Sequence, residues 1–314
     1  MDQDLNRLYE SVLRIRRVEE TIARLYPSDK IKSPVHLSIG QEAVAVGVID
    51  ALRADDVVAG TYRGHAAYIA KGGSLPAMFA ELYGKATGCA AGKGGSMHLI
   101  GMDRHILGNS AVVGTHIPVA LGFALAIKRH REERIVACFL GDGATEEGVF
   151  SESLNFAALH KLPMLFVCEN NGFAIHTPLG KRWATERLVE RVATYGIPAE
   201  RSAAHDVLTI RAAAGPLIDR VRAGAGPAFL ECPAIRWKEH VGPNEDFEVG
   251  YRQRPPAALW PAQDPVVQLG ALLDEAERQR IERQVEAEVE KAVDFAERSP
   301  TPAIEELYTN VYAA

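Results

Sequence analysis

The sequence of 314 residues has few cysteines, no long apolar run and no cluster of basic residues. Its four cysteines, at positions 89, 138, 168 and 232, form neither a C-x-x-C pair nor a disulfide pattern. The longest apolar stretch, residues 117–127, is too short to span a bilayer, and the first residues lack the order of a signal peptide. A net charge of −6 without a basic run argues against nucleic acid or a membrane as a partner. We therefore expect a cytoplasmic protein with reduced thiols.

Two apolar runs, each followed by a polar cluster, lie at the centre of the chain. Residues 135–140 are apolar and end at a GDG sequence (141–143). After a helical pattern, a second apolar run ends in ENNG (169–172). This order predicts two buried parallel strands joined by a helix. Ligands bind at the carboxyl ends of strands in open parallel sheets, so we expect an anionic ligand above Asp142 and Asn171.

The residue types at these strand ends indicate what that ligand is. Gly141 and Gly143 lack side chains, so backbone N–H groups can approach a phosphate at the start of the next helix. Asp142 would repel a bare phosphate, and Mg²⁺ is the cation that combines protein carboxylates with phosphate oxygens. Asn171 offers an amide oxygen, and the turn after it offers a backbone carbonyl. The residues therefore predict a magnesium-bridged diphosphate between two strand ends.

The specificity of this pattern comes from the pairing of its two halves. GDG alone is common in turns and is a weak indication of a ligand site. An Asn-Asn pair at the end of the adjacent predicted strand, with Asn171 lying 29 positions after Asp142, makes the pattern far more specific. One helix and one strand fill that distance.

This paired motif resembles the thiamine diphosphate motif, and the surrounding sequence resembles the alpha subunit of the E1 component of 2-oxo acid dehydrogenases. Pyruvate, branched-chain and acetoin types belong to that family. Four further blocks occur in the family's order: HLSIGQEA (36–43), TYRGHA (61–66), GKGGSMH (92–98) and VVGTHIPVALG (112–122). The resemblance covers roughly residues 8–255. It implies an α/β thiamine diphosphate-binding fold, with a mostly parallel sheet and helices on both faces.

The resemblance also implies roles for individual residues. His36 and His240 match active-site histidines of the family and are expected to be catalytic, although a lone histidine is usually structural. Tyr62 and Arg63 stand where the family has its cofactor-binding Tyr-Arg pair; an ordinary salt bridge is the alternative for Arg63. The expected cofactor-binding residues are Tyr62, Arg63, Ala111, Val113, Gly141, Gly143, Ala144 and Asn171. The expected metal ligands are Asp142, Asn171 and the backbone carbonyl of Phe173.

The sequence departs from the family pattern at several of these places. Phe173 replaces the usual tyrosine, which should not matter because the backbone carbonyl binds the metal. His176 stands where serine is frequent. The family usually has two histidines in the loop around residue 240, but only the second, His240, is present here. The serine that follows in regulated relatives is replaced by Val241, so we do not expect kinase control.

Apolar periodicity outside the central unit predicts further elements. We expect helices at 4–26, 41–51, 116–128 and 265–297, and a helix followed by a strand over 207–233. Six glycines in 84–101 predict a loop that supports the site, and 179–187 is expected to be a mobile loop. The sequence RPPAALWPAQDP (254–265) suggests a boundary between a cofactor domain, 1–254, and a C-terminal helical extension, 255–314.

The resemblance implies a thiamine diphosphate- and Mg²⁺-dependent enzyme. It decarboxylates a 2-oxo acid, or cleaves acetoin, and passes the acyl group to a lipoyl-bearing acyltransferase. Activation of the cofactor needs a glutamate on a second such domain, and the about 60 residues after 255 are too few for one. A beta subunit is therefore expected, in an α2β2 heterotetramer.

Two alternatives remain open at this point. GDGATEEG is also close to transketolase sequences, so a split transketolase or another non-oxidative carboligase subunit is the first. A non-catalytic homologue that only binds the diphosphate is the second. Retention of His36, Arg63, Asp142 and Asn171 argues against the latter.

Overall fold

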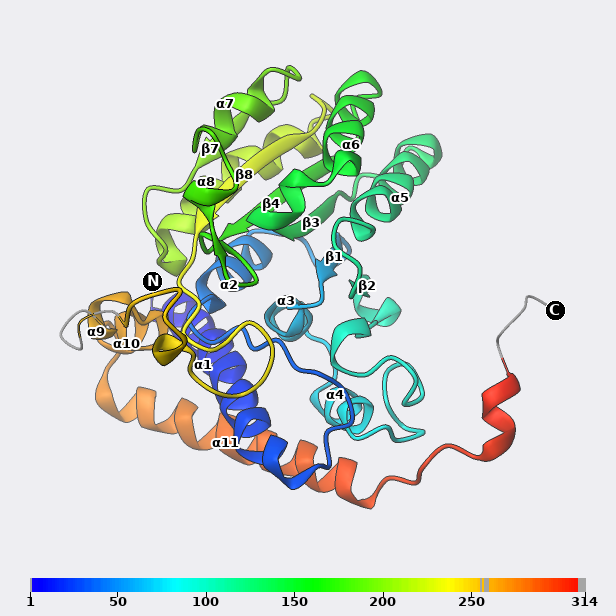
Figure 1. Ribbon diagram of the computed structural model, residues 1–314, viewed down its shortest axis with the longest axis vertical. Coiled ribbons are helices and arrows are strands. Elements are labelled where there is room, and N and C mark those ends of the chain that lie inside the picture. Colours follow the sequence, from blue (N-terminus) through cyan, green and yellow to red (C-terminus); the bar gives the residue numbers. More distant parts are fainter. Residues whose placement is uncertain (1, 255, 257–259, 310–314) are drawn as a thin grey trace.

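The computed structural model describes residues 2–254, 256 and 260–309. These residues form a six-stranded sheet in the order β2-β1-β3-β4-β8-β7, and every neighbouring pair is parallel (Figure 1). The strands are β1 Val57–Thr61, β2 Ile106–Ser110, β3 Val136–Gly141, β4 Met164–Asn170, β7 Ala199–Arg201 and β8 Ala228–Pro233. A separate hairpin pairs β5 Phe173–Ala174 with β6 Thr177–Pro178. The predicted α/β fold with a parallel sheet is confirmed.

The predicted strand–helix–strand unit forms the middle of this sheet. β3 and β4 pair in parallel from Val136 opposite Met164 to Gly141 opposite Glu169. Helix α6, Gly148–Leu159, connects them. Because parallel neighbours end at the same edge, the residues that follow β3 and β4 lie side by side.

Helices cover both faces of the sheet, and each face has its own apolar core (Figure 1). Side chains of β3 alternate between the two: Ala137 and Phe139 enter one core, whereas Val136, Cys138 and Leu140 enter the other. Burial on both faces explains why these strands appear in the sequence as continuous apolar runs. The first core packs against α1 Asp2–Leu25, α2 Glu42–Asp50, α3 His65–Ala70, α4 Leu75–Leu82, α8 Val207–Arg222, α10 Pro265–Gly270 and α11 Glu275–Arg298. The second packs against α5 His116–His130, α6 and α7 Leu188–Ala193.

The predicted helices all occur, with ends shifted by a few residues. The 265–297 region forms two helices, α10 and α11, and the 207–233 region forms α8 followed by β8. Strands β1, β2 and β7 and the β5–β6 hairpin were not predicted. β7 has the sequence AER at the edge of the sheet, where partly exposed residues give no apolar signal. β2 is also an edge strand, and most of its residues, including Gly108 and Asn109, are only half-buried.

The glycine-rich loop is organised around one buried carboxylate. Glu81, near the end of α4, is 1% exposed and accepts four backbone N–H groups at 2.7–3.0 Å. The donors are Ala90, Gly92, Gly94 and Gly95. Gly92 has φ +76, and a Cβ there would meet backbone at 2.7 Å. The glycines therefore let the loop wrap closely around Glu81 without regular structure.

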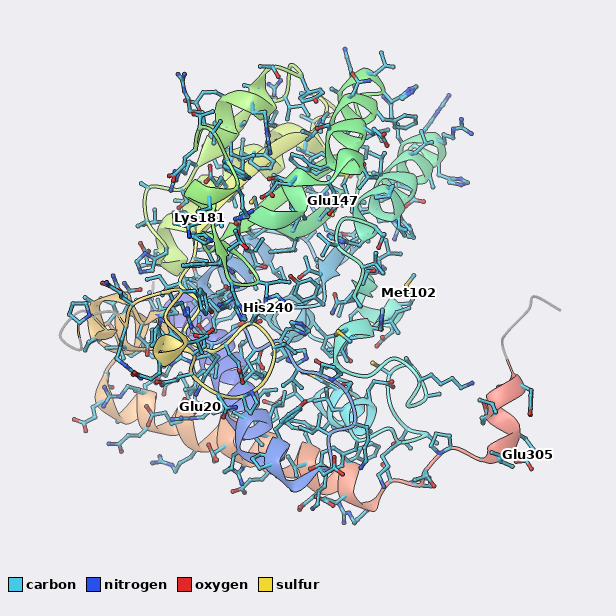
Figure 2. The ribbon with its side chains drawn as sticks, in the orientation of Figure 1. Glu20, Met102, Glu147, Lys181, His240 and Glu305 are labelled. Atoms are coloured by element: carbon cyan, nitrogen blue, oxygen red, sulfur yellow. The ribbon has the colours of Figure 1, made fainter. Side chains whose placement is uncertain are left out.

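The C-terminal helices pack back onto the start of the chain. α11 contacts α1 and α4, and its buried residues, such as Ile281 and Val285, belong to the same core as α1. Residues 255 and 257–259 of the predicted tether lie outside the described residues, and α9 Trp260–Gln263 follows them. The boundary between domains 1–254 and 255–314 stays a prediction. Beyond α11 the chain leaves the body of the molecule, where Figure 2 labels Glu305.

No helix among the described residues has the length and apolarity needed to cross a bilayer. Cys138, Cys168 and Cys232 are buried in β3, β4 and β8, where cysteine acts as a small apolar residue. All four cysteines are free.

Candidate active site

A cavity of about 250 Å³ opens where β1, β3 and β4 end. Its wall joins segments that are far apart in the sequence: 61–63 after β1, 141–144 after β3, the end of β4, the β5–β6 hairpin and His240. All the predicted metal ligands line it. So do the predicted cofactor-binding residues Tyr62, Arg63, Val113, Gly141, Gly143, Ala144 and Asn171. Ala111 and His36 are not among the lining residues in the described part of the chain.

The predicted metal ligands offer one carboxylate, one amide oxygen and one backbone carbonyl. Asp142 is 1% exposed. The side-chain nitrogen of Asn171 donates to Gln41 Oε1 at 2.9 Å, and its Oδ1 accepts the N–H of Phe173 at 3.0 Å. These bonds fix the amide while Oδ1 keeps a second lone pair.

This set of oxygen ligands fits Mg²⁺, which typically binds through few protein ligands plus phosphate oxygens and water. No group of three His, Cys, Asp or Glu side chains within the described ranges forms a metal site by itself. Phosphate oxygens or water would therefore have to complete the coordination of a cation held at Asp142.

The turn after β3 differs from the expectation in one respect. The sequence suggests that a helix starts directly after GDG, but a 3₁₀ helix, Asp142–Glu146, intervenes before α6. Glu147 is extended, with φ −70° and ψ 135°, and this conformation separates the two helices. The residues beside the cavity therefore belong to the short turn. A Cβ on Gly143 would lie 3.0 Å from that of Ala174, so glycine permits the close approach of the β5–β6 hairpin.

Arg63 is buried and connects two segments that border the cavity. Its Nη1 donates to the carbonyl of Leu37 at 2.6 Å, and its Nη2 donates to the carbonyl of His240 at 3.0 Å. Burial lowers the pKa of Arg63 to about 10, so the side chain stays charged at neutral pH. The structure thus places a permanent cation in the cavity wall. Its predicted contact with a diphosphate stays a prediction.

His36, Tyr62 and His240 form a cluster of three rings. Ring centroids are 4.5 Å apart for His36 and Tyr62, 5.1 Å for the two histidines, and 5.6 Å for Tyr62 and His240. The Nδ1 atom of His36 is buried without a hydrogen-bond partner. Burial, and then the charge of Arg63, lower the pKa of both imidazoles to about 3. Both rings are therefore neutral at physiological pH.

We expect the rings of His36 and His240 to remain neutral from pH 8 down to about 5. Unfolded histidine takes up a proton near its ordinary pKa of 6.5, but the folded rings do so only near 3. The unfolded state thus binds more protons than the folded state in this window. The contribution of the two histidines to the free energy of unfolding is therefore fully present above pH 6.5 and is lost as the pH drops. Histidine ring NMR, assigned with His36→Asn and His240→Asn, measures this directly. A midpoint above pH 5.5 for either ring would contradict the proposed environment.

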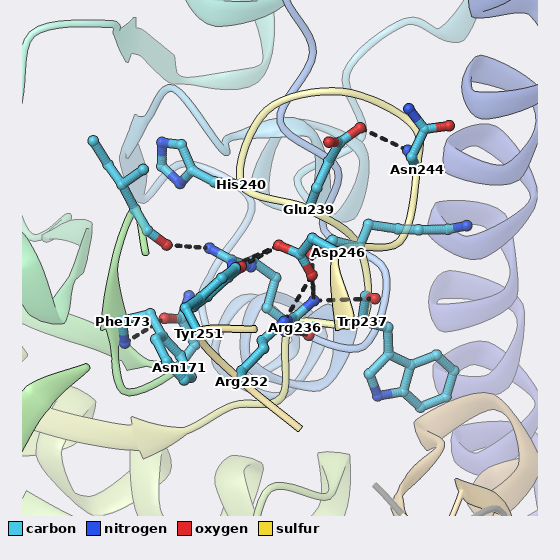
Figure 3. A network of polar contacts seen from close by, with 12 residues as sticks. Asn171, Phe173, Arg236, Trp237, Glu239, His240, Asn244, Asp246, Tyr251 and Arg252 are labelled. Atoms are coloured by element: carbon cyan, nitrogen blue, oxygen red, sulfur yellow. Dashed lines mark hydrogen bonds and ion pairs between the residues drawn. The ribbon is translucent and has the colours of Figure 1, made fainter. Parts of the chain in front are cut away.

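The loop that carries His240 is tied to the β5–β6 hairpin through a buried arginine (Figure 3). Arg236 is 2% exposed and donates to the carbonyl of Ile175 at 3.1 Å. It also pairs with Asp246, as does Arg252, whose Nε lies 2.7 Å from the carboxylate. The hairpin begins at Phe173, so these contacts link the predicted metal site to the loop of His240.

Glu239 precedes His240, in the loop where the first of the family's two histidines is missing, and His176 lies in the β5–β6 hairpin; both make contacts beside the site. The carboxylate of Glu239 accepts the N–H of Asn244 at 2.8 Å, and the N–H of Glu239 donates to the carbonyl of Asn244 at 2.9 Å. Glu239 therefore closes the turn that presents His240 (Figure 3). The ring of His176 lies 4.6 Å from that of Tyr251.

Several residues of the site were not singled out from the sequence. Glu169 lines the cavity, and burial raises its pKa to about 7. Gln41 orients Asn171, and Arg182 forms ion pairs with Asp142 and Glu146. Glu169 directly precedes the Asn-Asn pair, and Gln41 lies in the HLSIGQEA block. Both could therefore have been identified from their place in or beside a motif. No motif marks Arg182, which lies in a segment that was expected to be a mobile loop.

Comparison with known proteins supports the same assignment. The family model for the dehydrogenase E1 component matches residues 10–305. The chain is 38% identical over 312 residues to the alpha subunit of acetoin:2,6-dichlorophenolindophenol oxidoreductase from Bacillus subtilis, covering 98% of this chain and 93% of that protein. It is 39% identical over 317 residues to the pyruvate dehydrogenase E1 alpha subunit from Zymomonas mobilis, with coverages of 98% and 88%.

Solved structures agree on the fold. The transketolase from Campylobacter jejuni superimposes with a TM-score of 0.59 at 17% identity, over 98% of this chain and 50% of that one. The transketolase from Pichia stipitis gives 0.56 at 17% identity, over 93% and 48%. This chain thus spans about half of each transketolase. Together with the sequence matches, these results confirm the resemblance, and the chain belongs to the dehydrogenase E1 component family.

Proposed function

We propose that this chain is the alpha subunit of a thiamine diphosphate- and Mg²⁺-dependent E1 enzyme, which decarboxylates a 2-oxo acid or cleaves acetoin. The single observation that carries this proposal is the cavity at the sheet edge. Its wall combines Asp142, Asn171 and Phe173 with Tyr62 and Arg63. The names of the relatives from Bacillus subtilis and Zymomonas mobilis support the same reaction class.

The residues of the cavity would divide the work of binding. Asp142, Asn171 and the carbonyl of Phe173 hold Mg²⁺, which neutralises the diphosphate that Asp142 would otherwise repel. Gly141, Gly143 and Ala144 present backbone to the diphosphate, and Tyr62 and Arg63 contact it from the end of β1. By the family resemblance, the backbone around Ala111 and Val113 would lie on the aminopyrimidine side of the cofactor.

Thiamine diphosphate supplies carbanion chemistry for breaking a bond next to a carbonyl group. His240 borders the cavity, and the ring of His36, outside the cavity lining, is tilted against that of Tyr62. Because both rings are neutral at physiological pH, each has one N–H to donate and one nitrogen to accept. They therefore act as hydrogen-bond donors to the substrate carboxylate and the developing oxyanion, or pass a proton, rather than as fixed cations.

A beta subunit is proposed as the partner, in an α2β2 assembly. The relatives from Bacillus subtilis and Zymomonas mobilis are both named as alpha subunits. Exposed apolar side chains lie next to the cavity and along α5 and α6, namely Val112, Val113, Val119, Phe156 and Leu159. A partner that covers these side chains would remove them from water. A lipoyl-bearing acyltransferase is the proposed acceptor, and the cytoplasm is the proposed compartment.

The substrate class is tested with the assembled alpha–beta pair. We expect 2-oxo acids or acetoin to drive reduction of 2,6-dichlorophenolindophenol, in a reaction that needs thiamine diphosphate and Mg²⁺. Ketose phosphates are expected to give no reaction. Transfer of a two-carbon unit from a ketose phosphate to an aldose phosphate, without dye reduction by any 2-oxo acid, would instead favour the non-oxidative alternative.

A further inference from the structure

Arg182 forms an ion pair with Asp142, the proposed metal carboxylate. Its Nη2 pairs with Oδ2 of Asp142, and its Nη1 pairs with Oε1 of Glu146. The Nε of Arg182 donates to the carbonyl of Thr177 at 3.1 Å. The side chain of Arg182 is 7% exposed, and that of Asp142 is 1% exposed. A guanidinium fork is therefore fixed between two acidic side chains of the turn after β3.

The two partners of this ion pair face different cavities. Asp142 lines the proposed cofactor cavity, whereas Arg182, within the described part of the chain, lines only a neighbouring groove next to Trp183 and Arg191. The guanidinium contacts one oxygen of the carboxylate, Oδ2. Arg182 thus contacts Asp142 through a single oxygen, and the second carboxylate oxygen, Oδ1, is not paired with the guanidinium.

Two neighbours of Arg182 hold the same turn. The indole N–H of Trp183 donates to Glu146 Oε1 at 2.8 Å. Arg191 donates to the carbonyl of Thr145 at 3.0 Å, and its guanidinium carbon lies 5.3 Å from the ring centroid of Trp183. We call Arg182, Trp183 and Arg191 the bracket. The bracket comes from residues 182–191, whereas the turn that it holds lies at 142–146, so its contacts are tertiary.

Two opposite effects on metal binding follow from a cation beside Asp142. Its positive charge repels Mg²⁺, which would weaken binding. Its hydrogen bond fixes the carboxylate, and such outer partners typically strengthen metal affinity about 10- to 100-fold. Glu146 offsets the charge of Arg182, and Arg182 is not among the described residues that line the cofactor cavity. The orienting effect should therefore exceed the repulsion.

We propose that Arg182 is a positioning residue for the metal site: it holds Asp142 so that one carboxylate oxygen faces the cavity, and the bracket anchors the turn on which Asp142 lies. The proposal rests on the proposed function, in which Asp142 is a ligand of Mg²⁺. It also gives the 179–187 segment a role. Ordering of this segment and binding of the metal then stabilise each other.

The test uses the assembled alpha–beta complex and Arg182→Gln. Titration calorimetry with Mg²⁺, in the presence of excess thiamine diphosphate, is expected to give an affinity about 10- to 100-fold weaker than that of the parent complex. Arg187→Gln is the matched control. Arg187 is an exposed arginine of the same groove that pairs with Glu190 at 3.3 Å, and its replacement should leave the affinity unchanged.

Two further measurements separate positioning from a general loss of structure. Mn²⁺ in place of Mg²⁺ gives an electron paramagnetic resonance spectrum, which should be altered in Arg182→Gln and unchanged in Arg187→Gln. Arg182→Lys keeps a cation near Asp142 and should recover part of the affinity. If Arg182→Gln fails to assemble, the Mg²⁺ affinity of Arg182→Lys is measured instead. It is still expected to be weaker than that of the parent complex.

Unchanged or tighter Mg²⁺ binding in the Arg182 variants would overturn the proposal, because repulsion would then equal or exceed orientation. That result would leave the proposed function intact as long as the parent complex binds Mg²⁺ and thiamine diphosphate. Absence of any binding to the parent complex would instead overturn the proposed function.

Discussion

Replacement of Asp142 by alanine is expected to abolish binding of thiamine diphosphate with Mg²⁺ to the assembled complex. Asp142 provides the only carboxylate in the proposed ligand set, since Asn171 and Phe173 offer neutral oxygens. Its loss leaves the diphosphate without a bridging cation, and the proposed contact with Arg63 is already present in the parent complex, so it does not compensate. The loss of affinity should exceed the about 100-fold that removal of an outer partner alone can cost.

The isosteric variant Asp142→Asn separates charge from shape. It keeps an oxygen at this position but removes the negative charge, so it should also bind very weakly. Asp103→Ala serves as the control, because Asp103 is a strongly exposed carboxylate outside the cavity wall. Calorimetry measures the affinities, and thermal unfolding checks that the variants fold. Affinity of either Asp142 variant within about threefold of the parent would rule out Asp142 as a metal ligand.

The purified chain without its partner is expected to have no measurable turnover. The proposal assigns the glutamate that activates the cofactor to the beta subunit, and loss of a proton-transferring group costs about 10²- to 10⁴-fold. The exposed apolar side chains on α5 and α6 would also remain uncovered. Adding the beta subunit should restore activity and change the sedimentation of the alpha chain.

An active isolated chain would contradict this assignment. The cavity wall contains other carboxylates, among them Glu169, whose pKa is raised to about 7 by burial. Assaying Glu169→Gln in both the isolated chain and the complex would then show whether this residue replaces the partner's glutamate. If our proposal is right, the isolated parent chain has no turnover, so Glu169→Gln cannot lower the turnover of the isolated chain.

The centre of the fold could be predicted because its signals are local. The apolar runs before Asp142 and Asn171 are buried on both faces of the sheet, so they stand out against their polar ends. The edge strands β2 and β7 lack such runs. The contacts of Glu81 with the glycine-rich loop depend on backbone N–H groups, which no side-chain pattern reveals.

The site was partly predictable for the same reason. The GDG and NN motifs follow adjacent strands, so their meeting at one edge follows from parallel pairing. Arg182 reaches Asp142 only through tertiary folding of the 179–187 segment, and its position could not be read from local sequence. The 3₁₀ helix at 142–146 was not predicted, because GDG followed by apolar residues at helical spacing predicts that an α-helix begins there.

The most direct test is calorimetric titration of thiamine diphosphate into the assembled alpha–beta complex, once with Mg²⁺ and once with a chelator. We predict saturable binding of one cofactor per alpha chain with Mg²⁺ and its loss when the metal is removed. A complex that fails to bind thiamine diphosphate with Mg²⁺ present, or binds it equally well without metal, would contradict a metal-bridged diphosphate between Asp142 and Asn171.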